Sequence, residues 1–238
     1  MKLSLLEQAL AASRSGQAAA LATDLKTGRQ SFITGGETSG DLEHDAAAMD
    51  GVYRALADDR STTLDTPAGA VFVEVFNPRL RCLIVGAVHI AQPLAQVAAL
   101  AGYLVTVVDP RSAFASGLRF PGVELSTEWP DDALAQLKPN RRTAIVTLTH
   151  DPKLDDPALV AALRSEAFYI GALGSRKTHA ARCRRLTEAG FGEADLARIH
   201  GPIGINIGAV SPAEIAVSIM AEITQVLRED RRKEREPA

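Results

Sequence analysis

Cysteine and long apolar stretches are scarce in this 238-residue sequence, and each absence excludes a class of protein. The two cysteines, Cys82 and Cys183, have no Cys or His neighbours at zinc-site spacing, so neither a disulfide framework nor a structural zinc is expected. No apolar run approaches the roughly 18–20 residues that span a bilayer, and residues 1–7 do not resemble a signal peptide. We therefore expect a soluble, cytoplasmic protein without stable membrane insertion.

Charge and aromatic content argue against nucleic-acid binding. The net charge is −3, which gives no global attraction to a phosphate backbone, and Trp129, the only tryptophan, provides no stacking platform. Hydrophobic residues make up 46% and charged residues 23%, which is typical of a folded globular protein. No convincing catalytic pair or metal-ligand cluster stands out, so we assign neither catalytic residues nor a metal site.

The first 78 residues have the pattern of a small α+β domain. Its expected elements are helix 3–13, strands 17–23 and 29–34 around a hairpin turn, helix 41–57, and strand 69–76. Residues 35–40 read as a loop because of their glycine-rich composition. Asn77-Pro78 closes the last strand and marks the boundary of the domain.

Strands and helices alternate regularly from residue 79 to residue 230. The expected elements are strand 80–85, helix 89–101, strand 104–109, strand 123–126, helix 131–137, strand 143–149, helix 156–165, strand 168–173, helix 175–189 and helix 212–228. Near-continuous apolar strands such as 144–148 indicate burial on both faces, hence a parallel sheet with helices on each side. Residues 231–238 form a charged tail.

The turn after the first of these strands has the position of a dinucleotide fingerprint. Such a site uses Gly-x-Gly-x-x-Gly/Ala, whose second glycine lets the backbone approach a pyrophosphate. Here Gly86 and Ala91 fit the pattern, but Val88 replaces the second glycine and its branched side chain fills the space of a pyrophosphate. Asp109, at the end of the next strand, stands where a ribose-binding carboxylate is expected. The chain is therefore predicted to be Rossmann-like, with an impaired or different ligand site.

Two further turns are candidates for contact with an anionic ligand. His150 follows a strand and could serve as a general base oriented by Asp151, or donate to a phosphate; alternatively, Asp151 caps the next helix and His150 is solvated. Gly174-Ser-Arg176 opens a helix, where a cation is locally unfavourable unless an anion offsets it. We predict phosphate binding at this second turn.

The loop 201–208 is a further site candidate, because its three glycines among small apolar residues predict a tight loop at the crevice. The Ser211, Pro212 and Glu214 that follow are typical of a capped helix start, which is a structural feature. Cys82 lies in a buried strand and is expected to be inert. Cys183 lies among arginines that favour a thiolate if the side chain is exposed; the alternative is an ordinary cysteine on a helix surface. Three histidines are isolated in sequence and are interpreted as solvated or core residues: His44, His179 and His200.

Taken together, the motifs resemble those of the XdhC/CoxI family, the accessory proteins of molybdenum hydroxylases such as xanthine dehydrogenase. The matching segments are Gly86–Ala91, Val107–Arg111, Thr149–Asp151, Tyr169–Lys177 and Pro202–Glu222. As an ordered set covering about two-thirds of the chain, they are far more specific than any single motif. The resemblance implies a protein that binds the molybdenum cofactor and assists its sulfuration and its insertion into an apo molybdenum hydroxylase.

By resemblance, the cofactor-binding residues are Gly86, Ala87, His89, Asp109, Arg111, His150, Asp151, Gly174, Ser175, Arg176, Gly204 and Gly208. A cysteine desulfurase is a second candidate partner, and a homodimer is a candidate assembly. The family's first domain usually has a Gly-Gly-Gly-Cys-Val-Glu segment, but the related residues 35–43 contain no cysteine.

Two other classes of function are compatible with the same residues. The first is an NAD(P)-dependent oxidoreductase that uses the Rossmann-like crevice; Asp109 favours it and Val88 opposes it. The second is an interaction module that docks on the hydroxylase without carrying a cofactor.

Overall fold

The computed structural model describes residues 3–233, and the chain falls into two units that divide between Pro78 and Arg79. Each unit has its own sheet and its own core. The part of the predicted tail at residues 234–238 lies outside the described residues, whereas residues 231–233 belong to the last helix. None of the helices formed by residues 3–233 is sufficiently long and apolar to cross a membrane.

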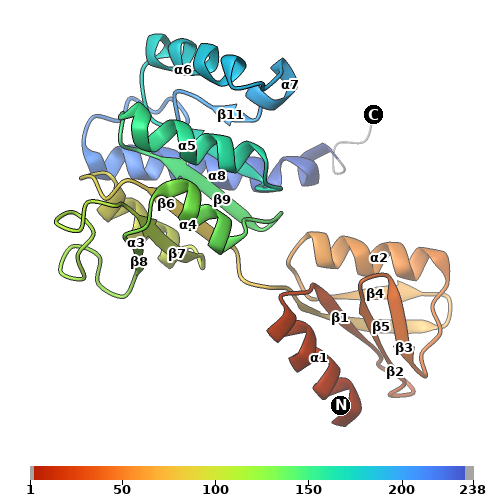
Figure 1. Cartoon of the computed structure of the whole chain (residues 1–238). Coiled ribbons are helices and arrows are strands. Elements are labelled where there is room, and N and C mark those ends of the chain that lie inside the picture. Colours follow the sequence, from red (N-terminus) through yellow and green to blue (C-terminus); the bar gives the residue numbers. More distant parts are fainter. Residues whose placement is uncertain (1–2, 234–238) are drawn as a thin grey trace. The chain divides into compact units, whose positions relative to one another are not determined.

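The first unit is an antiparallel sheet with one helix on each face (Figure 1). Its strand order is β3-β2-β1-β5-β4. The elements are α1 (Leu3–Ser15), β1 (Ala19–Asp24), β2 (Gln30–Thr34), β3 (Glu37–Gly40), α2 (Ala46–Ala57), β4 (Thr62–Thr66) and β5 (Gly69–Phe76). Alternating strand residues divide between the helices: Leu21 and Phe32 pack with α1, whereas Ala20 and Ile33 pack with α2.

The sequence-based prediction for this unit needs three corrections. Residues 37–40, expected to be a loop, form β3, whose four exposed residues carry no apolar alternation and are held by backbone pairing with β2. Helix α2 begins at Ala46 rather than near residue 41, because the Asp45 side chain accepts from Ala48 N and caps it. Strand β4, which was not predicted, pairs with β5.

The second unit contains a six-stranded parallel sheet, in the order β11-β10-β9-β6-β7-β8. Its strands are β6 (Arg81–Val85), β7 (Leu104–Val108), β8 (Glu124–Ser126), β9 (Thr143–Thr147), β10 (Tyr169–Ala172) and β11 (Ile199–His200). Its helices are α3 (Ala91–Leu100), α4 (Pro130–Leu137), α5 (Pro152–Leu163), α6 (Arg176–Glu188), α7 (Glu193–Leu196) and α8 (Pro212–Lys233).

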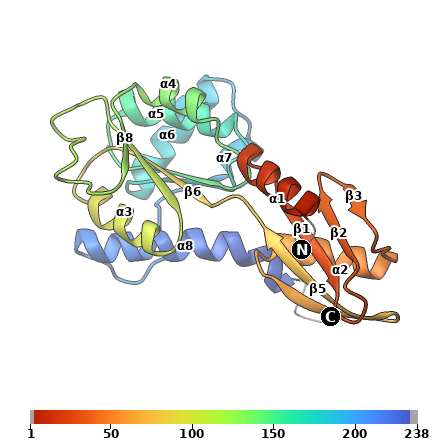
Figure 2. The same cartoon turned by 90° about the horizontal axis from the view of Figure 1, so that it is seen from below.

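Helices cover both faces of this sheet, as the apolar strands predict. Helices α3 and α8 supply the core on one face, and α4, α5 and α6 supply it on the other. Figure 2 shows α4, α5 and α6 on one side of the sheet and α3 and α8 on the other. The α/β prediction, a Rossmann-like parallel sheet domain preceded by a small α+β domain, is therefore confirmed.

Two short elements were not predicted from the sequence. Helix α7 is a single turn, and β11 has only two residues, which pair with Ile170 and Gly171 of β10. Neither is long enough to show a hydrophobic period. The longer strands were predicted to within about two residues at each end, which is the scatter expected of element boundaries.

The strand order determines where this unit can bind a ligand. Numbered along the chain, the six strands follow the doubly wound order 3-2-1-4-5-6, in which β6 is the first and β9 the fourth. The chain reverses direction of winding between β6 and β9, and ligands of such sheets bind outside the carboxyl ends of the strands at this point. Backbone pairing aligns those ends, since Val85 pairs with both Val108 and Thr147.

Ile219 and Val217 of α8 provide a test of the core beneath this sheet. Ile219 is fully buried, whereas Val217 is 51% exposed. Ile219→Ala should lower the free energy of unfolding by about 2–5 kcal/mol, because it removes buried methyl groups and leaves a cavity. Val217→Ala, the matched control, should change it by less than about 0.5 kcal/mol. Urea unfolding followed by far-UV circular dichroism and by Trp129 fluorescence measures both; equal effects would contradict this packing.

Candidate functional site

Turns at the carboxyl edge of the parallel sheet carry every residue that was predicted to bind the cofactor. Gly86, Ala87 and His89 follow β6, Asp109 and Arg111 follow β7, His150 and Asp151 follow β9, Gly174, Ser175 and Arg176 follow β10, and Gly204 and Gly208 follow β11. The sheet thus brings five separate turns to one edge. Their side chains differ in exposure and in partners, and these differences decide which of them can reach a ligand.

The turns after β6 and β9 pack directly against each other at the point where the winding reverses. Gly86 has a φ of +106°, and a Cβ at this position would lie 2.5 Å from Cγ2 of Thr149. Glycine is therefore required both by the backbone conformation and by the close approach. Ala87 is buried and His89 is exposed, so of these predicted residues only His89 presents its side chain to solvent.

Asp109 is buried and fully engaged within the chain. Its Oδ1 accepts from the backbone N–H of Arg111 (3.0 Å) and from Arg111 Nε (2.9 Å). Its Oδ2 accepts from the backbone N–H of Ala87 (2.8 Å) and from Arg111 Nη2 (2.8 Å). Burial acts to raise the pKa of this carboxyl, but the hydrogen bonds and charge of Arg111 and the Ala87 N–H outweigh it, so the pKa lies below its usual 3.8.

The role expected of Asp109 therefore changes. It stands at the end of β7, as predicted, but its carboxylate has 0% exposure and holds the turn after β6 instead of presenting oxygens to a ribose. Sequence position alone could not show this, because the competing donors come from a backbone N–H 22 residues away and from its own neighbour Arg111.

The segment that follows β7 is bound to the turn after β6. Arg119 Nη1 donates to the carbonyls of Ala87 (2.8 Å) and Phe114 (2.7 Å), and Gln92 Nε2 donates to the carbonyl of Arg119 (3.2 Å). The guanidinium of Arg111 stacks on the Phe114 ring, 4.6 Å from its centroid. Residues 111–119 thus tie the end of β7 to the start of α3.

The turn after β9 contains a helix cap rather than a catalytic dyad. The Asp151 side chain accepts from Lys153 N at 3.0 Å and caps α5. His150 is exposed and has a φ of +60°, an uncommon conformation for a residue other than glycine. Of the alternatives considered from the sequence, the structure therefore shows Asp151 as a helix cap. The side chain of His150 is exposed to solvent.

A buried ion pair that the sequence reasoning missed supports this turn from below. Oδ1 of Asp155 accepts from Thr149 N (3.3 Å) and Thr149 Oγ1 (2.6 Å), while Oδ2 lies 3.6 Å from Arg182 Nη2. Desolvation raises the pKa of Asp155, against the lowering effects of the Thr149 hydrogen bond and the Arg182 charge. Arg182 also donates to the carbonyl of Leu173 at 2.9 Å. One signal was available in the sequence: Arg182 precedes the apolar Leu186 by four residues, so both share the inward face of α6.

The start of α6 offers exposed positive charge. The Ser175 hydroxyl accepts from Thr178 N at 3.1 Å and caps the helix, and Gly174 has a φ of +144°. Arg176 and Lys177 are exposed in the first turn, which contains no acidic residue. A 13-residue helix carries a partial positive charge at this end, so an anion would be favoured there.

Glu222 of α8 anchors the glycine loop after β11. Its Oε2 accepts from Gly204 N at 2.7 Å and from the Tyr169 hydroxyl, and its Oε1 lies 3.4 Å from Nδ1 of His200. His200, interpreted as isolated, is stacked on the Tyr169 ring with centroids 4.7 Å apart. Burial opposes ionisation of Glu222, but hydrogen bonds from His200, Tyr169 and Gly204 outweigh it and lower its pKa. Gly208, at the end of the loop, is exposed.

Cys82 occupies the buried environment that the sequence predicted, whereas the thiolate character of Cys183 stays a prediction. Cys82 is fully buried, and desolvation raises its thiol pKa to about 12. Cys183 is partly exposed on α6, with its Sγ 3.5 Å from Nε2 of His179. This neighbour was not foreseen, although its i, i+4 spacing on a helix could have revealed it.

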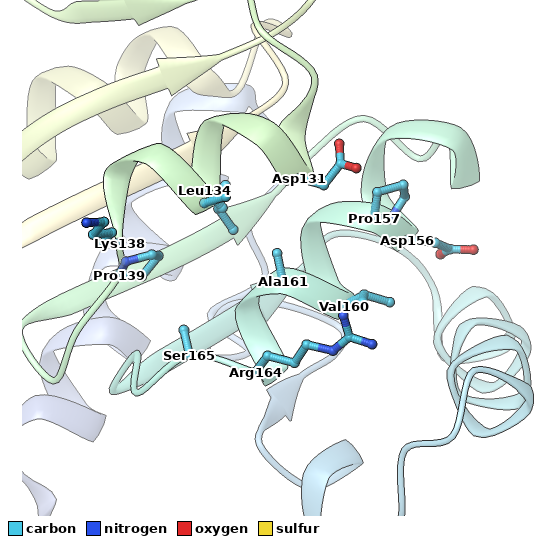
Figure 3. Close-up of a pocket in the computed structure, with 11 residues that line it drawn as sticks. Asp131, Leu134, Lys138, Pro139, Asp156, Pro157, Val160, Ala161, Arg164 and Ser165 are labelled. Carbon is cyan, nitrogen blue, oxygen red and sulfur yellow. The ribbon is translucent and has the colours of Figure 1, made fainter.

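A separate groove of about 700 Å³ lies between α4 and α5 (Figure 3). Leu134, Val160 and Ala161 are among its apolar lining residues, and Lys138 and Arg164 add charge. It contains none of the residues that were predicted to bind the cofactor. We therefore place the candidate site at the five turns rather than in this groove.

Comparison with known protein families matches the chain to the XdhC Rossmann domain over residues 82–223. The matched segment begins within β6 and ends within α8, so it contains all five turns of the candidate site.

Curated proteins with similar sequences include three bacterial relatives. An uncharacterized protein YqeB of Escherichia coli is 34% identical over 67% of this chain and 29% of its own length. A probable xanthine dehydrogenase subunit of Bacillus subtilis is 34% identical over 65% of this chain and 45% of its own. The molybdenum cofactor insertion chaperone PaoD of E. coli is 32% identical over 63% of this chain and 41% of its own. The matched part of this chain thus spans less than half of each relative.

A solved structure is similar over nearly the whole chain. A protein described as a xanthine dehydrogenase of Bacillus halodurans superposes with a TM-score of 0.70 and 25% sequence identity. The match covers 94% of this chain and 64% of the solved one. The small first unit is therefore part of the shared fold as well.

The pKa of Glu222 predicts how the anchor of the glycine loop responds to pH. Because the folded pKa is lowered below its usual 4.5, the carboxylate contributes stability above that value and loses it as the pH falls through the folded pKa. Glu222→Gln should lower the free energy of unfolding by about 1.5–3 kcal/mol at pH 7, the range for hydrogen bonds to charged groups. That difference should shrink below pH 4.5. Urea midpoints from pH 3 to 7 measure it, with exposed Glu229→Gln as control; a pH-independent difference would refute the assignment.

Thiol labelling should separate the two cysteines. At pH 8 in the native protein, an aromatic disulfide reagent should modify Cys183 and leave Cys82 unmodified, because Cys82 is fully buried and its pKa is raised to about 12. Unfolding in guanidinium should expose both thiols. The native Cys183→Ser variant should therefore give no reaction, and a native wild-type protein with two equally fast thiols would contradict this structure.

Proposed function

Since this chain belongs to the XdhC family, we propose that it is an accessory protein that binds the molybdenum cofactor and assists its insertion into a molybdenum hydroxylase. The names of two relatives, a molybdenum cofactor insertion chaperone and a probable xanthine dehydrogenase subunit, support this proposal. The client would be an apo-enzyme of the xanthine dehydrogenase type, and the predominant role would be that of a chaperone rather than a catalyst.

The observation that carries the proposal is the exposed basic start of α6, which follows β10, the strand next to β9. The pterin part of the molybdenum cofactor ends in a phosphate, and an anion of this kind suits the N-terminus of α6 with Arg176 and Lys177 in its first turn. Two basic residues at a positive helix end repel each other and the helix dipole unless an anion is present. We assign the phosphate to Gly174, Ser175 and Arg176.

The remaining predicted residues receive different parts in this proposal. Gly86, Ala87, Asp109 and Arg111 form a supporting structure for the turn after β6, since Asp109 and Ala87 are buried. His89 and His150 are exposed beside the reversal point and are the side chains available to contact a bound pterin. Asp151 positions the start of α5, and the loop with Gly204 and Gly208 forms a further wall.

Assistance with sulfuration is the finer part of the proposal. The family's cysteine segment is absent, and the corresponding residues here form the turn at Gly35-Gly36 and the exposed strand β3. The partly exposed thiol is Cys183, beside His179. We therefore propose that Cys183 takes part in sulfuration of the cofactor, with a cysteine desulfurase as the source of sulfur. We further propose a homodimer as the assembly.

NAD(P)-dependent oxidoreductases share this strand order, but the environment of Asp109 argues against such a function here. In such enzymes the acid at the end of the second strand binds a ribose hydroxyl. Here Asp109 has no exposed surface and accepts hydrogen bonds from Arg111 and Ala87. The cofactor-handling role therefore stands as our proposal.

Arg176→Ala tests the phosphate site. Loss of a charge-assisted hydrogen bond should weaken binding of the molybdenum cofactor by about 10–100-fold, corresponding to roughly 1.5–3 kcal/mol. The molybdenum that co-elutes with the protein in gel filtration, measured over a range of cofactor concentrations, gives the dissociation constant.

Arg184→Ala is the matched control, because Arg184 is also exposed on α6 but lies about two turns further along the helix. It should bind the cofactor as the wild type does. If Arg176→Ala has an unchanged dissociation constant and an unchanged melting temperature, the phosphate does not bind at this helix start.

A further inference from the structure

The hydrogen-bonding capacity of Asp109 is used up inside the chain. An ionised carboxylate offers about four lone-pair sites, and Asp109 receives four hydrogen bonds, two on each oxygen. Three of them come from Arg111 and one from the backbone of Ala87. With 0% exposure, the carboxylate has neither a free acceptor site nor a surface at which a ligand hydroxyl could approach.

The donors that occupy Asp109 are stronger than the ligand groups they exclude. Arg111 Nε and Nη2 donate to the two different oxygens at 2.9 and 2.8 Å, a bidentate guanidinium–carboxylate pair. Such charge-assisted bonds are roughly twice as strong as bonds between neutral groups. A ribose hydroxyl, which is neutral, would therefore have to displace stronger bonds in order to bind Asp109.

The neighbouring segment closes the same half of the crevice. Arg119 donates to the carbonyl of Ala87, and Phe114 lies under the guanidinium of Arg111. Val88 stands where a dinucleotide fingerprint has its second glycine, and it is half-buried against the core. The β6–β7 half, which takes the nucleoside in dinucleotide-binding sheets, is thus occupied by the chain itself. The basic start of α6, after β10, remains exposed.

From these contacts we infer that the crevice selects a pterin cofactor whose phosphate is a monoester over a form that carries an attached nucleoside. The selecting element is the Asp109 clamp, which we define as Ala87, Asp109 and Arg111. This inference rests on the proposed function for the identity of the pterin ligand. The exclusion of a nucleoside follows from the clamp and can be tested without that ligand.

ADP-ribose and NAD⁺ are suitable probes of the nucleoside half. Isothermal titration calorimetry on the full chain should detect no saturable binding of either probe to the wild type up to millimolar concentration. Arg111→Ala removes the two guanidinium hydrogen bonds to Asp109 and uncovers its oxygens, while the backbone N–H of residue 111 is retained. The variant should therefore bind ADP-ribose at least tenfold more tightly than the wild type does.

Two further variants control this result. Arg141→Ala removes an exposed arginine that pairs with the exposed Glu166, near the amino end of β9, and should leave the probes unbound. Arg111→Lys keeps the charge but loses the bidentate fork, and should give an intermediate gain. If Arg111→Ala fails to fold, as judged by its melting curve, Arg111→Lys and the wild type decide the question.

Micromolar binding of ADP-ribose or NAD⁺ to the wild type would overturn the inference, as would folded Arg111 variants with no gain in affinity. In a parallel arm, the wild type should bind the monoester form of the molybdenum cofactor at least tenfold more tightly than its dinucleotide form. Equal binding of both forms contradicts the inference but leaves the proposed function intact. Binding of neither form contradicts the proposed function, while the ADP-ribose titrations still test the clamp.

Discussion

The parallel backbone pairing between β6, β7, β9 and β10 is the constraint on which the candidate site depends. Val85 pairs with Val108 and Thr147, and Thr147 pairs with Ala172, so four strands end in one row. Every turn then starts from the same edge, whatever its own sequence. The hydrogen bonds between the strand backbones thus bring together side chains that lie far apart in the sequence, although these side chains take no part in those bonds.

Three carboxylates hold the turns that this row generates. Asp109 accepts from Ala87 N, Asp155 from Thr149 N, and Glu222 from Gly204 N. Burial opposes the ionised form of all three, and the balance differs: hydrogen bonds prevail and lower the pKa at Asp109 and Glu222, whereas desolvation prevails and raises it at Asp155. Three charged groups at the rim of the crevice therefore face the protein's own backbone, and exposed basic side chains lie at the start of α6.

Much of the fold could be predicted from the sequence, but the partners of the site residues could not. Buried strands such as β6 and β9 are recognisable because their residues are continuously apolar, whereas β3 and β11 depend on pairing and have no such pattern. Spacing placed Asp109 at the end of β7, yet its role depends on an N–H from another turn. Asp155 was not singled out, and Glu222 stood only at the end of a motif, because an acidic residue on a helix gives no local sign of what it will reach.

The link between Glu222 and Gly204 has a mechanical consequence. Glycine-rich segments are usually the most pliable part of a binding edge, since each residue has wide backbone freedom. Here the middle of loop 201–208 is fastened through one carboxylate to α8, a helix of 22 residues that is packed against α3 and the sheet. A displacement of the loop at Gly204 must break this hydrogen bond or move α8, so the helix restrains this part of the loop.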